Sequence, residues 1–390
     1  MAEYSQINPG KYHLGYRFPT PVLIEKLPMN AEDEHRIDLK FKHSVVVGRT
    51  VYVGNVQVFA WRNGSIKVEA DSMYKSIVNQ FDVFASYNKI EAAVNDGEEI
   101  TALAEFADKI LQFKQNTLYI INVSQQVEIL ESTHKYKGVN NPAAVCKTDY
   151  GVAWANEHGC FLYDGKNVTD LLERQGVQKI KESDWESFCF NPMIGYFPRK
   201  RQLIVVDDVS TAGDGSVFIY DMVTGSWVKG ANVFADAVKS NLTNDWSGDL
   251  IHSSINYIKK WSDTSVQATG FSLKTKDIDF GQPGVRKKIY KAYVSYKGDG
   301  TAVTLQYAIN GDTDTVAPFY RTQADGSSDG SNSDTTPLLD VGTDDWVLGE
   351  LKPVSSINNV YSFQLIFDGT AAADFEINDI SIVYRLKNIK

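Results

Sequence analysis

Short runs of alternating apolar and polar residues, separated by polar turns, fill most of the chain. A tyrosine-bearing turn recurs at Tyr119, Tyr163, Tyr220 and Tyr257, at intervals close to the roughly 40 to 50 residues of a propeller blade. Because one such unit cannot bury its apolar face alone, the units are expected to stack on one another. The pattern predicts an all-β chain with a β-propeller of about five blades over residues 41–265.

Tight turns mark the strands inside the predicted blades. From residue 41 onward, two turns that contain Arg49 and Asn55 divide the sequence into three short β-rich runs, as in a β-meander. The segment 221–227 resembles the outer hairpin of many propeller blades. In such a hairpin a glycine takes the positive-φ position, and Trp227 is expected to cover the blade face.

Three segments are harder to assign. Residues 69–84 are less regular and are expected to contain a helical turn. Residues 100–113 fit an amphipathic helix by the spacing of their apolar side chains, but the flanking turns favour two strands. Residues 177–188, which contain Trp185, are expected to form a short helix or an irregular excursion. This excursion lengthens one of the tyrosine intervals, and a subunit contact is first expected there.

Both ends of the chain differ from the middle. Residues 1–40 are polar and interrupted by prolines, which predicts an extended N-terminal arm that docks on a partner. Residues 266–390 contain five strand-like segments, most with period-two alternation, which predicts a C-terminal β-sandwich. Within it, the Gly/Ser/Asp/Thr-rich residues 311–345 are expected to form a flexible loop that docks on partners.

Composition and charge narrow the classes of function. The chain has 390 residues, of which 43% are hydrophobic, and a formal net charge of −10. This acidic balance argues against wrapping of a nucleic-acid backbone, which needs clustered cations. The basic run Arg286, Lys287 and Lys288 is short and is interpreted as a solvated turn or a subunit contact. Neither an ordinary secretion signal nor a membrane-spanning segment is expected from the apolar pattern.

No common catalytic motif is found. The sequence lacks a nucleophile elbow, a zinc-protease motif, a Walker A loop and a dinucleotide-binding glycine motif. The six histidines lie far apart, although His158 is close to Cys160, and the three cysteines have no C-x-x-C spacing, so they are interpreted as reduced, buried thiols. Acidic residues at 207–214 and 312–314 leave calcium coordination open. We therefore expect no enzyme activity, no catalytic residue, no metal site and no cofactor.

Five stretches of the sequence are similar to a known family. They lie at residues 37–55, 74–84, 106–114, 147–154 and 277–288. Together they resemble the propeller-bearing virion proteins, called tail nozzle or tubular tail protein B-like, of short-tailed (podovirus-type) bacteriophages. The likeness runs from about residue 37 to the C-terminus and so covers most of the chain.

The resemblance implies a non-enzymatic ring of identical copies, commonly six, attached below the portal and adaptor and in contact with other tail proteins. Such a ring forms part of the genome ejection channel, so DNA passes through it transiently without sequence-specific binding. Six copies would carry a net charge of about −60, and an acidic wall repels the passing DNA backbone. The implied location is the virion tail, after assembly in the host cytoplasm. Tail nozzles are often considerably longer than this chain, so parts of the tube would be either absent from it or built by another protein.

Eight residues from these patterns are candidates for structural or interface roles: Arg49, Asn55, Trp154, Trp185, Trp227, Arg286, Lys287 and Lys288. An alternative hypothesis is a carbohydrate-binding or adhesin-like module. A propeller joined to a β-sandwich also suits sugar recognition, and aromatic side chains stack on sugars. An enzyme with an uncatalogued motif is a third hypothesis.

Overall fold

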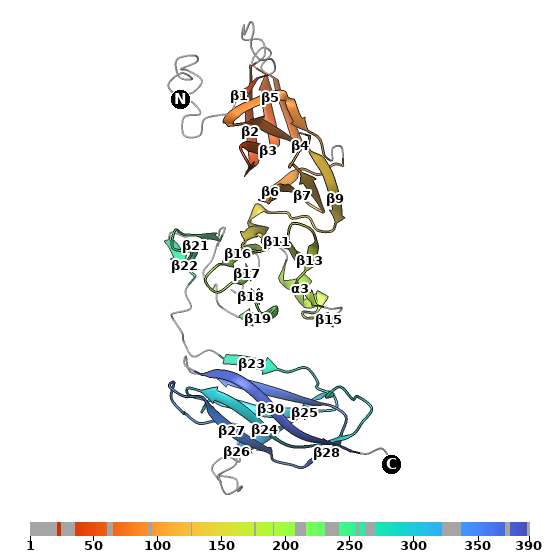
Figure 1. Ribbon diagram of the computed structural model, residues 1–390, viewed down its shortest axis with the longest axis vertical. Helices are drawn as coiled ribbons and strands as arrows, with labels where there is room; N and C mark the ends of the chain where they lie inside the picture. Colours follow the sequence, from red (N-terminus) through yellow and green to blue (C-terminus); the bar gives the residue numbers. More distant parts are fainter. Residues whose placement is uncertain are drawn as a thin grey trace. The chain divides into compact units, whose positions relative to one another are not determined.

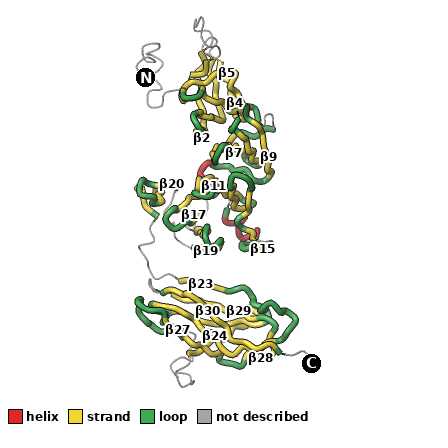
Figure 2. The backbone as a smooth tube through the Cα atoms, in the orientation of Figure 1, coloured by secondary structure: helices red, strands yellow, loops and turns green. Residues whose placement is uncertain are grey.

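Strands and the turns between them make up almost all of the described part of the protein (Figure 2). The computed structural model describes residues 22–24, 36–60, 65–92, 96–125, 127–174, 177–189, 191–206, 216–230, 242–254, 257–261, 270–321, 337–370 and 375–387. The predicted all-β class is confirmed. The chain divides into two compact units, Met1–Trp261 and Ser262–Lys390, whereas the sequence pattern places a boundary between residues 265 and 266.

The first sheet of the first unit is a closed five-stranded barrel. Its strands are β1 (Val22–Ile24), β2 (Arg36–Val47), β3 (Thr50–Ala60), β4 (Ser65–Ile77) and β5 (Gln80–Ile90). The short strand β1 pairs antiparallel with β2 and parallel with β5, which closes the ring of strands. Closure leaves no free strand edge in this sheet.

The barrel differs from three expectations. It replaces the propeller blade predicted from residue 41, because β1 joins the first and last long strands. Val22–Ile24 and residues 36–40 belong to the barrel and not to the arm predicted for residues 1–40, whose other residues lie outside the described ranges. The helical turn expected within residues 69–84 is wrong, because β4 and β5 continue through that segment around a hairpin turn.

Four further antiparallel sheets follow the barrel in chain order (Figure 1). The sheet β6–β9 contains β6 (Ile100–Phe106), β7 (Lys109–Lys114), β8 (Thr117–Asn122) and β9 (Ile129–Lys135). The sheet β10–β13 contains β10 (Val145–Thr148), β11 (Gly151–Asn156), β12 (Gly159–Tyr163) and β13 (Val168–Asp170). The sheet β16–β19 contains β16 (Met193–Phe197), β17 (Gln202–Val206), β18 (Val217–Asp221) and β19 (Ser226–Gly230). The three-stranded sheet β20–β22 contains β20 (Thr243–Asn244), β21 (Leu250–Ser254) and β22 (Tyr257–Lys260).

Short elements connect these sheets. They are the 3-10 helix η2 (Pro142–Ala144), the paired strands β14 (Glu173–Arg174) and β15 (Val177–Gln178), and the helix α3 (Glu182–Phe188). The two strands favoured over residues 100–113 are confirmed as β6 and β7, and α3 confirms the short helix within residues 177–188. In the described ranges, no helix has the length and apolar character needed to span a bilayer.

The recurring tyrosines lie on the same strand, counted along the chain, of successive sheets. Tyr119 lies on β8, Tyr163 on β12, Tyr220 on β18 and Tyr257 on β22. Each of these strands is the third of its sheet. The tyrosine spacing therefore marks one sheet per interval, and the longest interval contains β14, β15 and α3.

The middle sheets are buried on both faces, which explains their uninterrupted apolar runs. On β17, Leu203 and Val205 belong to the core shared with the sheet β10–β13, whereas Ile204 and Val206 belong to the core shared with the sheet β20–β22. The residues of β11 divide in the same way between the preceding and the following sheets. A further core joins the barrel to the sheet β6–β9. Each sheet thus packs on its neighbours in chain order.

The described residues of the second unit form eight antiparallel strands around one apolar cluster that includes Tyr296, Phe319 and Phe363. The strands are β23 (Gly270–Lys274), β24 (Lys287–Lys297), β25 (Val303–Ile309), β26 (Asp312–Arg321), β27 (Val347–Pro353), β28 (Ile357–Val360), β29 (Phe363–Thr370) and β30 (Glu376–Leu386). All five predicted strands of this region are confirmed as β23, β24, β25, β29 and β30.

The loop predicted over residues 311–345 is wrong in its first third. Asn310 and Gly311 both have positive φ, at 54° and 74°, and form a two-residue turn that leads from β25 directly into β26. Residues 322–336 lie outside the described ranges.

Candidate functional site

A pocket of about 170 Å³ opens where three consecutive sheets of the first unit meet. Its lining residues come from the segments 115–116, 136–144, 155–158 and 191–192. These segments connect β7 to β8, β9 to β10 and β11 to β12, and the last one precedes β16. Connections held by rigid strands are the usual location of binding residues.

Two Asn-Pro pairs place amide side chains in the pocket. Asn141-Pro142 precedes β10, and Asn191-Pro192 precedes β16. A proline keeps the residue before it out of the helical region, and Asn141 is accordingly extended, with φ −136° and ψ 132°. The Oδ1 of Asn141 accepts a hydrogen bond from the N–H of Ala143 at 2.9 Å and caps η2. Each pair ends the connection that leads into the next sheet.

Asn156 holds the neighbouring segments of the pocket together. Its Nδ2 donates to the carbonyl oxygens of Tyr136 and Gly138, at 3.0 and 2.8 Å. Its Oδ1 accepts from the backbone N–H of His158 at 2.9 Å and of Gly159 at 3.1 Å. The connection 136–144 is therefore tied to the β11–β12 hairpin by a single side chain whose donors and acceptor are all used.

Gly138 allows two connections to approach closely. A Cβ atom at this position would lie 2.2 Å from the carbonyl oxygen of Lys114 and 2.6 Å from both the carbonyl oxygen of Gln115 and the backbone nitrogen of Thr117. The backbone N–H of Val139 also donates to the Lys114 carbonyl at 3.0 Å. The β7–β8 turn and the connection 136–144 are thus in backbone contact, and this contact forms one wall of the pocket.

Two aromatic rings stand at the pocket. The rings of Tyr136 and His158 meet edge to face, with 5.5 Å between their centroids. Tyr136 is 65% exposed and has a left-handed backbone, with φ +64°. The left-handed conformation of a non-glycine residue costs about 1 to 2 kcal/mol. At Tyr136 it is held by the hydrogen bond from Asn156 to the Tyr136 carbonyl oxygen. The strained backbone holds the tyrosine at the pocket, where its ring is accessible to solvent.

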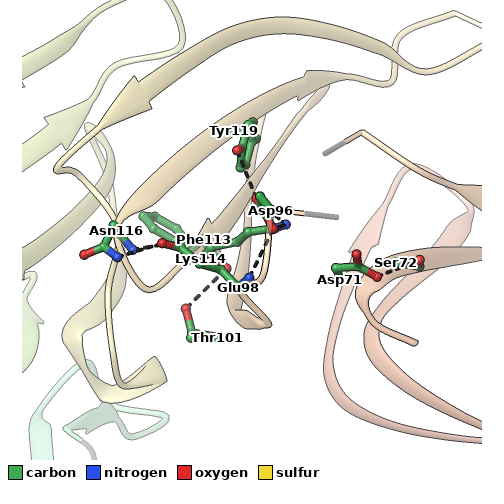
Figure 3. Close-up of polar contacts among 9 residues, drawn as sticks. All are labelled: Asp71, Ser72, Asp96, Glu98, Thr101, Phe113, Lys114, Asn116 and Tyr119. Atoms are coloured by element: carbon green, nitrogen blue, oxygen red, sulfur yellow. Dashed lines mark hydrogen bonds and ion pairs between the residues drawn. The ribbon is translucent and has the colours of Figure 1, made fainter. Parts of the chain in front are cut away.

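A buried lysine, Lys114, lies at the start of the β7–β8 turn and forms an ion pair with Asp96 (Figure 3). Lys114 is 0% exposed, and its Nζ lies 2.7 Å from both carboxylate oxygens of Asp96. The hydroxyl of Tyr119 donates to the same carboxylate at 3.2 Å. A buried ammonium needs such a partner, because an unpaired buried charge is costly.

The ionisation of this cluster follows from its contacts. Burial alone would raise the pKa of Asp96, but hydrogen bonds from Lys114 and from the backbone N–H of Glu98 outweigh burial and hold that pKa below its ordinary value. Burial, followed by the Asp96 carboxylate, raises the pKa of Tyr119. Beside the pair, the Glu98 carboxylate accepts from the backbone N–H and the Nδ2 of Asn116, at 3.2 and 2.6 Å. The turn that carries Asn116 is therefore fixed from two sides.

The chemistry of the pocket is that of hydrogen-bonding recognition. Its lining contains six asparagine or glutamine residues but neither lysine nor arginine. Glu157 and His158 are ionisable lining groups, and their side chains are about half exposed. In the parts of the chain described above, no group of three His, Cys, Asp or Glu side chains is placed to hold a metal ion.

The predicted tryptophans lie in the core of the first unit. Trp154 is fully buried between the first two sheets after the barrel, and its ring packs on Phe113 at 5.3 Å between centroids. Trp185 on α3 is 1% exposed and donates its Nε1–H to the carbonyl oxygen of Asn156 at 2.9 Å. Trp185 therefore has a structural role, and the subunit contact expected in the excursion around it stays a prediction. Trp227 is half-buried and packs on Trp185, with its Nε1–H bonded to the Leu171 carbonyl at 2.9 Å.

The two candidate residues that lie in the barrel, Arg49 and Asn55, have separate roles. Arg49 is exposed in the β2–β3 turn, and its carbonyl oxygen accepts a hydrogen bond from Asn79 of the β4–β5 turn at 2.9 Å. Asn55 is buried at a bulge in β3, with φ +58°. Its Nδ2 donates to Glu99 Oε2 at 2.7 Å and to the Ile100 carbonyl at 3.0 Å, which ties the barrel to β6.

The predicted basic run lies in the second unit. Lys287 is fully buried, and its Nζ donates to the carbonyl oxygens of Gln282 and Tyr361, at 2.6 and 2.7 Å. Arg286 donates its Nε–H to the hydroxyl of Tyr361 at 3.0 Å. The ammonium of Lys288 lies 4.9 Å from the centroid of the Tyr290 ring. Lys287 is therefore a core residue of the second unit.

The structure also locates the cysteines, the His158 and Cys160 pair, and one of the two acidic segments. The three cysteines are free thiols, with Cys160 and Cys189 buried as predicted and Cys146 half-buried. His158 faces solvent while Cys160 lies in the core, so the pair is not a site. The acidic residues 207–214 lie outside the described ranges. The Asp312 carboxylate accepts from the backbone N–H groups of residues 314 and 315, at 3.1 and 3.2 Å, and so caps a turn.

Comparisons with known proteins do not identify a family. No protein-family model matches the chain, and no curated protein matches significantly. Among solved structures, the extracellular domain of the one component system BT4673 from B. thetaiotaomicron is 12% identical, with a TM-score of 0.33 over 62% of this chain. The chain spans 28% of that protein's length. Hsv2 of Kluyvelomyces marxianus is 8% identical, with a TM-score of 0.33, and covers 64% of this chain and 76% of its own.

A third similar structure is the complex of the fission yeast SREBP-SCAP binding domains. It is 11% identical to this chain, with a TM-score of 0.30, and the match covers 88% of this chain and 89% of that one. TM-scores this low carry no argument about fold or function.

Proposed function

We propose that this protein is a non-catalytic structural component of the tail of a short-tailed bacteriophage, of the tail nozzle type. In this proposal the sheets β6–β9 to β20–β22 are blades of a propeller, and the second unit is a β-sandwich. Identical copies form a ring that contacts the portal, the adaptor and other tail proteins. DNA passes through the ring without sequence-specific contacts. The sequence stretches that resemble such virion proteins and the net charge of −10 support this role.

The observation that carries the proposal is an exposed tryptophan in the last sheet of the first unit. Trp246 is 106% exposed, although the turn that carries it is well fixed. The Oδ1 of Asp245 accepts from the backbone N–H groups of Ser247 and Asp249, at 2.8 and 2.9 Å. On the adjacent strand β22, Ile258 is also exposed. Tryptophan is enriched at protein interfaces and is the residue type that most often dominates their binding energy.

The barrel exposes a second apolar surface. Val78 and Phe81 lie at the β4–β5 turn and are both more than half exposed. This turn is bonded to Arg49 through the backbone of Asn79. Two different surfaces on one chain, one on the first sheet and one on the last, suit head-to-tail association. Repetition of such a contact gives a ring when the rotation closes.

Mixing two variants of the full chain tests this association. Val78→Ser with Phe81→Ser removes the barrel surface, and Trp246→Ser with Ile258→Ser removes the last-sheet surface. We expect the unmodified chain to form rings or head-to-tail multimers, seen by negative-stain imaging and by light scattering. Each double variant alone should be monomeric. An equimolar mixture should stop at dimers, because each partner keeps one intact surface.

Val223→Ser is the matched control, because this exposed valine lies on the β18–β19 turn. It should assemble like the unmodified chain. A chain that remains monomeric at high concentration, or double variants that assemble normally, would refute the head-to-tail ring.

A further inference from the structure

The amide pocket between the three sheets contains more hydrogen-bonding capacity than the fold uses. Among the described residues, the side chains of Gln115, Asn140 and Asn191 make no hydrogen bond, although all three line the pocket. Asn141 uses its Oδ1 to cap η2, which leaves its Nδ2 for another partner. Asn116 binds Glu98 through its Nδ2, which leaves its Oδ1. Donors and acceptors from four connections therefore surround one cavity.

The charge of the lining restricts what these groups can bind. No lysine or arginine lines the pocket, so a phosphate or carboxylate would find no fixed cation there. A carboxamide offers two donors and an acceptor in one group. It therefore matches the hydroxyl group, which both donates and accepts, better than it matches an ion. The lining favours a neutral ligand with several hydroxyls.

The aromatic rings favour a ligand that also has an apolar face. Tyr136 is largely exposed at the pocket, with His158 edge-on beside it. An aromatic ring supplies a large contact area at low cost in conformational entropy. Sugar rings combine a face of C–H groups with a rim of hydroxyls, so they complement a tyrosine ring surrounded by amides.

Size and rigidity complete the argument. The volume of about 170 Å³ is below the roughly 300 to 1,000 Å³ of pockets for drug-sized ligands, so one sugar ring is the appropriate size. The walls are already fixed by Asn156, Gly138 and the Lys114–Asp96 pair. A preformed site loses little entropy on binding. We propose that this pocket binds a single neutral sugar residue, such as the end of a glycan chain.

The sugar site goes beyond the assembly role and does not depend on it. Its test uses the full chain and saturation-transfer NMR with glucose, galactose, mannose, fucose, N-acetylglucosamine and N-acetylgalactosamine. Inorganic phosphate and glucuronate serve as anionic comparisons. We expect at least one neutral sugar to bind with a Kd of about 1 to 10 mM, whereas the anions should not compete.

Pocket variants locate the binding. Asn140→Ala and Asn191→Ala should each weaken the bound sugar roughly three- to tenfold. Tyr136→Asn removes the ring with a residue that tolerates the left-handed backbone, and it should abolish measurable binding. Gln125→Ala, an exposed amide outside the pocket, should change nothing. All four variants should retain the melting temperature and the assembly of the unmodified chain.

Three results would overturn the proposal: no neutral sugar binds at concentrations well above the expected Kd, phosphate or glucuronate displaces the sugar, or both asparagine variants bind the sugar with the Kd of the unmodified chain. Loss of multimers together with intact sugar binding would refute the ring and leave the sugar site standing.

Discussion

The indole N–H of Trp185 donates a hydrogen bond to the backbone carbonyl of Asn156 at 2.9 Å. Trp154, which is buried to the same extent in the neighbouring core, has no hydrogen-bond partner for its Nε1. The two tryptophans therefore form a natural comparison. Both lose the same volume when changed to phenylalanine, but only one of them loses a hydrogen bond.

We expect Trp185→Phe to be more destabilising than Trp154→Phe by roughly 1 to 3 kcal/mol. The first change removes a hydrogen bond to a part-buried carbonyl, whereas the second removes a donor that had no partner. Urea denaturation of both variants, followed by far-UV circular dichroism, measures the difference. Equal midpoints would show that the Trp185 hydrogen bond has no net effect on stability.

Gly138→Ala tests the backbone contact between the connection 136–144 and the β7–β8 turn, which forms one wall of the pocket. The added Cβ would collide with the backbone of the β7–β8 turn, and this backbone cannot rotate away as a side chain would. We expect a loss of roughly 1 to 3 kcal/mol of unfolding free energy, as for other overpacked sites. Gly284→Ala is the control, since a Cβ there meets no atom within 4 Å. If both variants melt together, the two segments are farther apart than described.

The Asp96 carboxylate gives the protein a specific dependence on acid. Its pKa is lower in the folded chain than in the unfolded chain. Its contribution to stability is therefore complete above the unfolded pKa of about 3.9 and is lost as the pH falls through the lower, folded pKa. At pH 7, Asp96→Asn should cost roughly 1.5 to 3 kcal/mol, the value of a hydrogen bond to a charged group.

The difference between the unmodified chain and Asp96→Asn should shrink as the pH falls below about 4. Chemical denaturation at a series of pH values measures it. Asp108→Asn, on the exposed β6–β7 turn, is the control and should behave like the unmodified chain. A difference that stays constant down to the acid transition would contradict the depressed pKa.

The two buried thiols should be inert in the folded protein. Burial raises the pKa of both Cys160 and Cys189, which keeps them protonated, and the thiolate is the reactive form. At pH 8 we expect Ellman's reagent to leave both unmodified until denaturant is added. Burial also raises the pKa of Cys146, so this half-buried thiol should resist the reagent as well. Mass spectrometry of the labelled peptides identifies the sites. Rapid labelling of Cys160 in the native chain is the contrary outcome.

Local sequence patterns predicted much of the secondary structure. The spacing of the tyrosines follows the third strand of successive sheets, because each sheet repeats the same order of strands and turns. The segment around Trp185 was correctly expected to contain a short helix. The turn at Asn310 and Gly311 has a strong hairpin signal, Asn-Gly, but the polar composition of the residues after it favours a loop.

Long-range features could not be predicted in the same way. The barrel closes through a parallel pair between Val22 and Val83, and no local pattern announces a contact across that separation. The pocket also depends on four connections that meet only after the sheets have packed. Its one readable signal is the repeated Asn-Pro before β10 and β16. That signal predicts that both asparagines have an extended backbone, but it does not predict that they line the same pocket.

The closed barrel has a consequence for biosynthesis. A barrel satisfies the edges of its own strands, whereas the sheet β6–β9 covers one face with the barrel and each later sheet of the first unit covers one face with its predecessor. The N-terminal part of a chain is made first and generally folds first. The folded barrel can therefore provide the surface on which the sheet β6–β9 packs as it is synthesised. Each later sheet of the first unit can then pack on the sheet made before it. Without the barrel, the apolar face of the sheet β6–β9 that normally packs on it would stay exposed during translation. We expect such a chain to aggregate.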